Sequence, residues 1–362
     1  MKIKNIAKRI LNSHNDSTLN CGFMINPYIF GGGAVGGWKE LARTTLGSAN
    51  TSIDVTSLPN KRYYMVLCST DNTGNNDVFT RFNSDTGSNY NSRTNYNGAG
   101  EWSGAASSFI YHYSYANDFG YPKFGIDYIA NYSTKEKLTI THVMDSGGDG
   151  AGNAPRRGET VGKWANTSNA ISSLTRRLSG TNTYYSGSEV VVLGWDPADT
   201  HTTNFWTELA STTLTGSADT IDSGTFTAKK YLWVQAYVKQ TTSNIRIATR
   251  FNSDTGSTYC VRDSEVGGAD STATSQTYIK NSGSNSFSGF INMFIVNVSS
   301  KEKLAISHYV GQNTAGAGNA PTRHEVVGKW ANTSNSITSI QLYNDQAGDY
   351  ASGSILKVWG SD

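Results

Sequence analysis

Two stretches of this chain, residues 131–169 and 297–335, align without gaps and share 25 of their 39 residues. The strings they share are KEKL (135–138 and 301–304), AGNAP (151–155 and 317–321) and VGKWANTSN (161–169 and 327–335). Self-similarity over this length means that one structural unit occurs twice in the chain. Whatever fold the first unit adopts, we therefore expect the second to adopt as well.

The match extends outward from these stretches with small changes in length. Trp38 and Trp206 stand at its two beginnings, and the string RFNSDTGS occurs at 81–88 and again at 250–257. The sequence therefore predicts three parts, which are an arm (residues 1–36), a first domain called copy 1 (residues 37–196) and a second domain called copy 2 (residues 197–362). Because the join is only a few residues long, we expect the two domains to lie close together.

The segments between turns have the composition of strands. Residues 61–69 (KRYYMVLCS) and 229–238 (KKYLWVQAYV) are rich in aromatic and β-branched side chains, and residues 137–143 (KLTITHV) alternate in polarity. Turn signals rich in Gly, Asn and Ser separate these segments. We therefore predict an all-β protein in which each copy is an antiparallel β-sandwich of about eight strands, jelly-roll-like in type.

The charge balance argues against nucleic acid as a partner. Only 16% of the residues are charged and the formal net charge is +2, so the chain carries no broad basic field. The opening residues interleave lysine and arginine with single apolar residues, and no later stretch is apolar over the length of a bilayer span. We therefore expect neither a secretory signal nor a membrane span, and the three cysteines indicate no disulfide framework.

The arm, residues 1–36, has no second copy and ends in a glycine-rich joint. Its first residues have apolar side chains at helical spacing between basic ones, which predicts a short amphipathic helix. We interpret this helix as an anchor that docks on an acidic or apolar partner surface, and a frayed terminus is the alternative. The assembly residues are Lys2, Ile3, Lys4, Ile6, Lys8, Arg9 and Ile10.

Titratable residues that match between the copies are the candidates for a shared active site. His142 and His308 occupy equivalent positions of the KEKL strand, but the sequence names no nucleophile or orienting carboxylate beside them. We interpret them as buried core histidines. The matched carboxylates are Glu40 and Glu208, Asp85 and Asp254, and Glu159 and Glu325. They stand in turn-like or strand-edge settings, whereas glycoside hydrolysis needs two carboxylates facing a cleft, so we expect no enzymatic activity and no cofactor.

A metal site has one candidate. Asp145 and Asp149 in MDSGGDGAGN offer oxygen ligands of the kind that calcium prefers. Copy 2 has Gly311 and Ala315 at these positions, so an ion would belong to copy 1 alone. We interpret the segment as a solvated turn and assign no metal.

The aromatic residues that the copies do not share point to a binding surface. Between residues 109 and 124 copy 1 is dense in tyrosine, whereas copy 2 has the string NSGSNSFSG at 281–289. An exposed cluster of this kind suits a protein interface or stacking on sugar rings, and a loop packed on its own domain is the alternative. The candidate binding residues of this surface loop are Trp102, Tyr111, His112, Tyr113, Tyr115, Phe119 and Tyr121.

The strings GGWKELARTTLGSANTSIDV, KRYYMVL, RFNSDTGSNY, the KEKL strand, AGNAP, VGKWANTSN and GSEVVVLG together resemble a family of tail and virion-associated proteins of tailed bacteriophages. The resemblance covers both copies. It implies a place in the virus particle and supplies no catalytic residues. Other virion proteins are the partners that it implies, and symmetric self-association into a homo-oligomer is expected of such components.

Two functional hypotheses follow from these observations. In the first, the chain is a virion structural protein, a head or tail decoration or fibre component, anchored by the arm and displaying two sandwiches. In the second, it is a carbohydrate- or receptor-binding module that contacts a glycan of the host surface through the tyrosine-rich loop. A capsid shell protein built as a double jelly roll is a weaker third reading, because the close similarity of the copies indicates a recent duplication.

Overall fold

The computed structural model describes residues 37–362 except 75–76, 114–120, 242, 285–286 and 313–315. Within that part of the chain every regular element is a β-strand, which confirms the all-β prediction. The arm and its expected helix lie outside the described residues. None of the described segments is a helix long and apolar enough to cross a membrane.

Each copy contains twelve strands among the described residues. Those of copy 1 are β1 (Lys39–Thr45), β2 (Ser52–Val55), β3 (Tyr63–Thr70), β4 (Val78–Phe82), β5 (Tyr90–Tyr96), β6 (Trp102–Ser107), β7 (Ile110–Tyr113), β8 (Lys123–Ala130), β9 (Lys137–Asp145), β10 (Arg156–Trp164), β11 (Leu174–Leu178) and β12 (Glu189–Trp195). Those of copy 2 are β13 (Thr207–Thr213), β14 (Thr220–Asp222), β15 (Tyr231–Val238), β16 (Ala248–Phe251), β17 (Tyr259–Glu265), β18 (Ser271–Gln276), β19 (Ile279–Lys280), β20 (Gly289–Val296), β21 (Lys303–Gly311), β22 (Thr322–Trp330), β23 (Ile340–Tyr343) and β24 (Ile355–Ser361).

Both copies arrange these strands in the same topology. In copy 1 an eight-stranded sheet has the order β1-β12-β3-β8-β9-β10-β5-β6, and a four-stranded sheet has the order β2-β11-β4-β7. Copy 2 repeats this order as β13-β24-β15-β20-β21-β22-β17-β18 and β14-β23-β16-β19, and the strand pairs are antiparallel. The prediction of two tandem antiparallel β-sandwiches is confirmed, with more strands per copy than the eight expected.

The string VGKWANTSN closes each sandwich through its tryptophan. Trp164 is buried at the end of β10, and its indole Nε1 donates a hydrogen bond to Asp85 Oδ2 at 2.7 Å. Trp330 makes the same bond to Asp254 in copy 2. The turn that presents Asp85 holds Asn83 at a φ of 52°, a left-handed conformation that asparagine tolerates. The repeated RFNSD and VGKW strings are therefore two halves of one tertiary contact.

The KEKL string is explained by its second lysine. The Nζ of Lys137 is buried under the sandwich and donates to the backbone carbonyls of Ser133, Lys135 and Asn166 at 3.3, 3.0 and 2.7 Å. Lys303 makes the equivalent three bonds in copy 2. A buried ammonium is tolerated because carbonyl oxygens replace its water.

Strand β9 buries its polar side chains and exposes its apolar ones, which is the opposite of what the polarity of its sequence indicates. Thr139 and Thr141 are buried, whereas Leu138 and Ile140 are exposed. His142 lies on the same outward side as Leu138 and Ile140, since side chains two residues apart share a face. His142 and His308 are therefore buried where the two copies meet, and not inside their own sandwiches.

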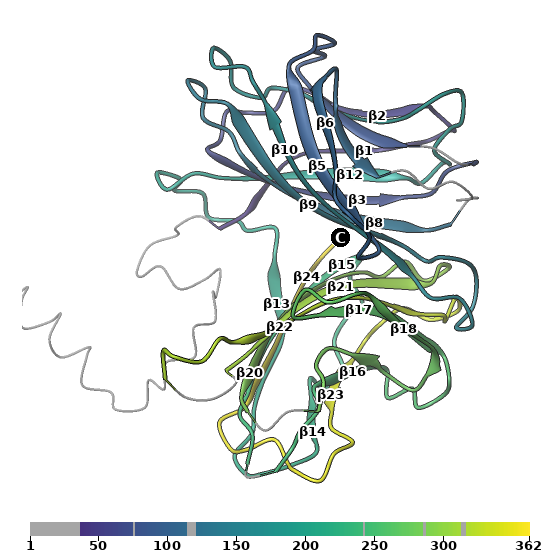
Figure 1. Cartoon of the computed structure of the whole chain (residues 1–362), viewed down its shortest axis with the longest axis vertical. Coiled ribbons are helices and arrows are strands. Elements are labelled where there is room, and N and C mark those ends of the chain that lie inside the picture. Colours follow the sequence, from purple (N-terminus) through teal and green to yellow (C-terminus); the bar gives the residue numbers. More distant parts are fainter. Residues whose placement is uncertain (1–36, 75–76, 114–120, 242, 285–286, 313–315) are drawn as a thin grey trace, which may run out of the picture.

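A hydrophobic core between the copies joins the two eight-stranded sheets, which face each other in Figure 1. From copy 1 it contains Met65, Leu67, Phe124, Ile126, Met144, Val191 and Leu193. From copy 2 it contains Phe205, Trp206, Tyr231, Trp233, Phe294, Val296, Leu304, Ile306, Val327 and Trp359. Domains that share a large apolar interface do not move freely, so we infer that the two copies form one block.

Candidate functional site

The predicted aromatic surface lies where the two sheets of copy 1 end. Trp102 stands on β6, the last strand of the eight-stranded sheet, and is 52% exposed. Tyr111 stands on β7, the last strand of the four-stranded sheet, and its hydroxyl donates to Asp77 Oδ1 at 2.9 Å. The centroids of the two rings are 4.9 Å apart. The structure therefore brings together two of the predicted residues, on different sheets.

Two further rings, Phe109 and Phe79, continue the row beside Tyr111, although Phe79 is only 6% exposed. Phe109 lies 6.5 Å from Tyr111 between ring centroids, and it stacks on Phe79 at 4.3 Å. The Arg81 guanidinium lies 5.3 Å over the Phe79 ring and donates to the carbonyl of Ser108 at 3.0 Å. We call Phe79, Trp102, Phe109 and Tyr111 the aromatic edge. The equivalent positions of copy 2 are Ala248, Ser271, Tyr278 and Lys280, so copy 2 keeps one of the four rings and the full aromatic edge belongs to copy 1.

His112 does not belong to this surface. It is 2% exposed, and its Nε2 lies 2.7 Å from Thr80 Oγ1 inside the sandwich. Asn281 takes its place in copy 2 and bonds to Thr249 Oγ1 at 2.9 Å. The prediction of a surface loop fails for this residue because residues 110–113 form strand β7, whose side chains alternate between outside and inside.

The other predicted residues are placed only in part. Tyr113 ends strand β7, and Tyr121 is partly buried just before β8. Tyr115 and Phe119 lie outside the described residues, as do Lys2, Ile3, Lys4, Ile6, Lys8, Arg9 and Ile10 of the arm.

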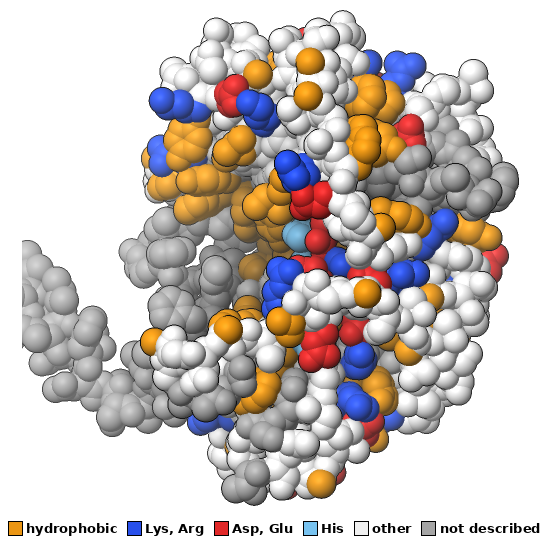
Figure 2. Space-filling view, viewed as in Figure 1, with side chains coloured by type: hydrophobic (Ala, Val, Ile, Leu, Met, Phe, Trp, Pro, Cys, Tyr) orange, Lys and Arg blue, Asp and Glu red, His pale blue; other side chains and the backbone are white. Residues whose placement is uncertain are grey.

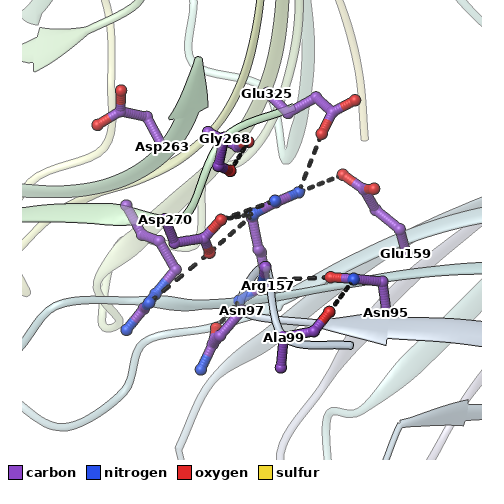
Figure 3. A network of polar contacts seen from close by, with 12 residues as sticks. Asn95, Asn97, Ala99, Arg157, Glu159, Asp263, Gly268, Asp270 and Glu325 are labelled. Atoms are coloured by element: carbon purple, nitrogen blue, oxygen red, sulfur yellow. Dashed lines mark hydrogen bonds and ion pairs between the residues drawn. The ribbon is translucent and has the colours of Figure 1, made fainter. Parts of the chain in front are cut away.

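The interface between the copies contains a charged cluster around Arg157, on β10. Its guanidinium donates to Asp270 of copy 2, with Nη2 at 2.8 Å from Oδ1 and Nε at 3.0 Å from Oδ2, and it also contacts Glu159 and Glu325. Figure 3 shows Arg157 reaching between these three carboxylates, two of which come from the other domain. Arg157 is buried, so the cluster is a strong electrostatic link between the domains.

Two equivalent histidines meet next to this cluster. The rings of His142 and His308 lie edge to face with 4.4 Å between centroids, beside a cavity of about 190 Å³ that also touches Ile126, Tyr128 and Asn292. Burial lowers the pKa of His142 to about 4 and that of His308 to about 3, so both rings are neutral at neutral pH. Figure 2 shows a histidine at the seam between the domains, among charged side chains.

Glu159 has a shifted pKa in the same cluster. Burial raises its pKa to about 7, and the nearby Glu325 carboxylate adds to this rise. Shifted carboxylates and histidines occur in active sites and also in structural ion-pair networks. Because Arg157 is shared by carboxylates from both domains, we interpret the cluster as part of the interdomain contact.

A groove of about 520 Å³ also runs between the copies. The charged residues that line it are Asp71, Lys123, Lys229, Lys230, Lys301, Glu302 and Asp362. Lys301 binds Asp71 and Lys230 binds Glu189 at 2.9 Å, each pair joining one domain to the other. These charges are therefore used for the domain contact.

Asp145, the first candidate calcium ligand, is buried at the end of β9. Its Oδ1 accepts hydrogen bonds from Arg156 Nε at 2.8 Å and from the Gly147 amide at 2.7 Å. A carboxylate that is paired with arginine has less capacity left for a cation. Among the described residues no group of three or more His, Cys, Asp or Glu side chains is arranged to hold a metal ion.

The sequence did not identify the interdomain contacts. The sequence did contain one signal, the regular alternation of apolar residues and threonines in β9. In the structure the threonines face the interior and the apolar residues face outward. Without knowledge of a second sheet outside, this alternation is compatible with either orientation of the strand.

No protein-family model and no curated protein matches this chain. Among solved structures, domains LG4-5 of the mouse laminin α1 chain match at 10% sequence identity, over 91% of this chain and 92% of that chain, with a TM-score of 0.19. A TM-score this low supports no inference about fold or function.

Proposed function

We propose that this chain is a non-enzymatic structural protein of a bacteriophage particle, a head or tail decoration or fibre component that displays two β-sandwiches as one rigid block. The observation that carries the proposal is the hydrophobic core between the copies, which contains side chains from both eight-stranded sheets. A display component must hold its outer surface at a fixed position, and a shared apolar core prevents the domain motion that a bare linker allows.

Two further observations support this proposal. The repeated strings resemble those of virion-associated proteins of tailed bacteriophages. The charged cluster at Arg157 and the ion pairs at Lys230 and Lys301 add polar contacts around the apolar core, so the relative position of the domains is specified as well as stable.

The first experiment tests the location. An antibody raised against residues 37–362 is applied to purified particles of the virus that encodes the chain, and labelled particles are examined in micrographs. We expect label at one class of position on intact particles. Particles that remain unlabelled, with the protein found only in the unassembled fraction, would overturn the proposal.

The second experiment tests the arm as the anchor. A variant that lacks residues 1–33 is supplied during particle assembly beside the full chain, and both are quantified in purified particles. We expect the shortened variant to be left out of particles while it still folds. Equal incorporation of both would remove the arm from the assembly mechanism and leave the particle location to the first experiment.

A second candidate function, binding of a host-surface glycan, is favoured by the aromatic edge. An exposed indole beside a tyrosine offers flat apolar faces for sugar rings, and the Asp77 carboxylate next to Tyr111 offers hydrogen-bond acceptors for hydroxyl groups. Copy 2 has Ser271 and Lys280 in place of Trp102 and Tyr111, so copy 1 is the domain that we expect to bind.

The exchange of copy 1 residues for those of copy 2 tests this function. Trp102→Ser introduces serine, the residue that copy 2 has at the equivalent position 271. The control is Tyr185→Ala, which changes another exposed aromatic residue to alanine, the residue that copy 2 has at the equivalent position 351. In a screen against host-surface glycans, we expect Trp102→Ser to lose binding and Tyr185→Ala to keep it. Equal binding by both variants would exclude the aromatic edge.

A further inference from the structure

One loop of copy 1 covers one face of copy 2. Residues 147–155, between β9 and β10, are called the docking loop, and they lie against β17, β18 and β22 of the other domain. Gly150 donates its amide to Glu302 Oε1 at 2.6 Å, and the Pro155 carbonyl accepts from Arg262 Nε at 2.8 Å. The loop also accepts hydrogen bonds from Ser275 N at the Ala151 carbonyl (2.8 Å), from Cys260 Sγ at the Asn153 carbonyl (3.0 Å) and from Lys329 Nζ at the Gly148 carbonyl.

The copy 2 face, defined by Leu304, Ile306 and Val327, is closed from solvent by copy 1. These side chains are 0%, 3% and 4% exposed and belong to the core between the domains. An ion pair beside them, Lys329 to Glu302 at 3.0 Å, is also buried.

The copy 1 face, defined by the equivalent residues Leu138, Ile140 and Val161, is open. These side chains are 56%, 52% and 50% exposed. The equivalent ion pair, Lys163 to Glu136, has the same length of 3.0 Å but lies in solvent. Hydrophobic side chains gather at the left of the upper domain in Figure 2, on the side where the domains diverge.

A second ion pair shows the same difference. Arg262 and Asp270 lie 3.7 Å apart at the covered face of copy 2, and Asp270 is almost fully buried. The equivalent residues of copy 1, Arg93 and Glu101, are 2.6 Å apart and more than half exposed. Copy 1 therefore has the apolar residues and both ion pairs of the docking surface, without a loop on top of them.

The loop that matches the docking loop is exposed. Residues 316–321 of copy 2 have the sequence GAGNAP, identical to residues 150–155 in the docking loop. Pro155 is buried where the docking loop meets copy 2. Pro321 and its neighbours in residues 316–320 are exposed. One molecule thus presents an open docking face at one domain and an exposed loop of matching sequence at the other.

We propose that the copy 1 face binds residues 316–321 of a second copy of this chain, in the way that the docking loop binds copy 2 within one chain. The same pairing of loop and face is already realised once in the molecule, which identifies the occupant. In the complex Glu136 accepts from the Gly316 amide and Arg93 donates to the Pro321 carbonyl, as Glu302 and Arg262 do for Gly150 and Pro155.

The loop comes from another molecule because the core between the domains fixes copy 2 of the same chain in a position that leaves the copy 1 face open. The contact joins unlike surfaces, so it is head-to-tail, and each bound molecule presents a new open face. Such a contact continues into a ring or a filament. This inference goes beyond the proposed function and does not depend on a place in a virus particle.

The test measures the mass of the full chain in solution over a range of concentrations, by light scattering after gel filtration. We expect the average mass to rise with concentration. Ile140→Asp places a charge on the open face and Ala317→Glu places one on the loop, and each should weaken association about tenfold or more. Val266→Asn is the control, since Val266 is 60% exposed elsewhere and Asn97 is its copy 1 equivalent.

A mixture of the two variants identifies the head-to-tail arrangement. Ile140→Asp retains its loop and Ala317→Glu retains its face, so together they should form a dimer and nothing larger. A wild-type chain that stays monomeric at all concentrations would overturn the inference, as would an Ala317→Glu variant that dimerises alone through two copy 1 faces. Association that appears only after removal of residues 1–36 would overturn it in favour of the arm as the occupant. Unchanged thermal unfolding of each variant shows that it is folded.

Discussion

Arg176 and Asp127 form an ion pair inside copy 1, with 2.5 Å between Nη2 and Oδ2, where copy 2 has Leu342 and Met293. Both charged side chains are buried, and Arg176 also donates to Cys68 Sγ at 3.1 Å. Within the described part of the chain, Arg176 Nε and Asp127 Oδ1 have no hydrogen-bond partner. The same fold thus contains one sandwich with a charged pair in its interior and one with an apolar pair at the same positions.

This difference predicts a double-mutant result. Arg176→Leu alone leaves Asp127 as an unpaired buried charge and should lower the free energy of unfolding by about 3–5 kcal/mol. The double variant Arg176→Leu/Asp127→Met introduces the pair of copy 2 and should be neutral or more stable by about 1–4 kcal/mol. Urea denaturation of the three chains measures both effects, and a double variant as unstable as the single one would contradict the prediction.

The His142 and His308 pair predicts a loss of stability in acid. An unfolded histidine has a pKa near 6.5, whereas burial holds the native values at about 4 and about 3. Below pH 6.5 the unfolded chain binds more protons than the folded chain, so stability falls as the pH drops from about 6.5 toward 4. We expect the variant His142→Gln/His308→Gln to show a smaller fall in melting temperature between pH 7 and pH 4.5.

Glu159 should make stability depend on pH in the opposite direction. Its native pKa of about 7 lies above its ordinary value of 4.5, so the folded chain binds more protons and stability falls as the pH rises from about 4.5 to 7. Glu159→Gln should therefore gain stability relative to the wild type as the pH is raised through this range. A gain that is independent of pH would show that the titration of Glu159 is not linked to folding.

Arg157 and Arg323 occupy equivalent positions in the two copies, but their replacement should destabilise the protein to different extents. Arg157 is buried and bridges the domains, whereas Arg323 is 59% exposed and pairs with Glu325 of its own strand at 3.1 Å. Arg157→Ala should lower the free energy of unfolding by about 3–5 kcal/mol, because the buried Asp270 loses its hydrogen-bonded partner and keeps only the more distant Arg262. Arg323→Ala should cost less than about 1 kcal/mol, as exposed pairs do. Calorimetry distinguishes the two, and similar losses would refute the bridging role.

The reactivity of the Cys260 thiol should report whether the docking loop is in contact with copy 2. Its thiol donates to the Asn153 carbonyl of the docking loop, and burial raises its pKa to about 12. In a Cys21→Ser background, a thiol reagent at pH 8 should react slowly with the native protein and faster after Arg157→Ala, which loosens the loop. Cys68, whose pKa burial raises to about 11 inside copy 1, should not react faster. Equal acceleration at both thiols would indicate global unfolding.

Much of the fold follows from the sequence. The repeated strings identify two domains, and the last strand of copy 1 ends at Trp195 and the first of copy 2 begins at Thr207, on either side of the expected join. Trp164 and Trp330, the tryptophans of the two VGKW strings, are both buried in the cores of their own sandwiches. The site was predicted less well, since Trp102 and Tyr111 do form one surface but His112 is buried.

The sequence by itself determined the number of domains, their all-β class and the contacts that both copies must make, because identical strings impose identical local packing. Only the tertiary structure decided which face of β9 is covered and by what. Leu138 and Leu304 each end a KEKL string, yet Leu138 is exposed and Leu304 is buried, because Leu304 belongs to the core that the two domains share. Local sequence fixes which side chains share a face of a strand, but contacts with distant segments fix whether that face meets water.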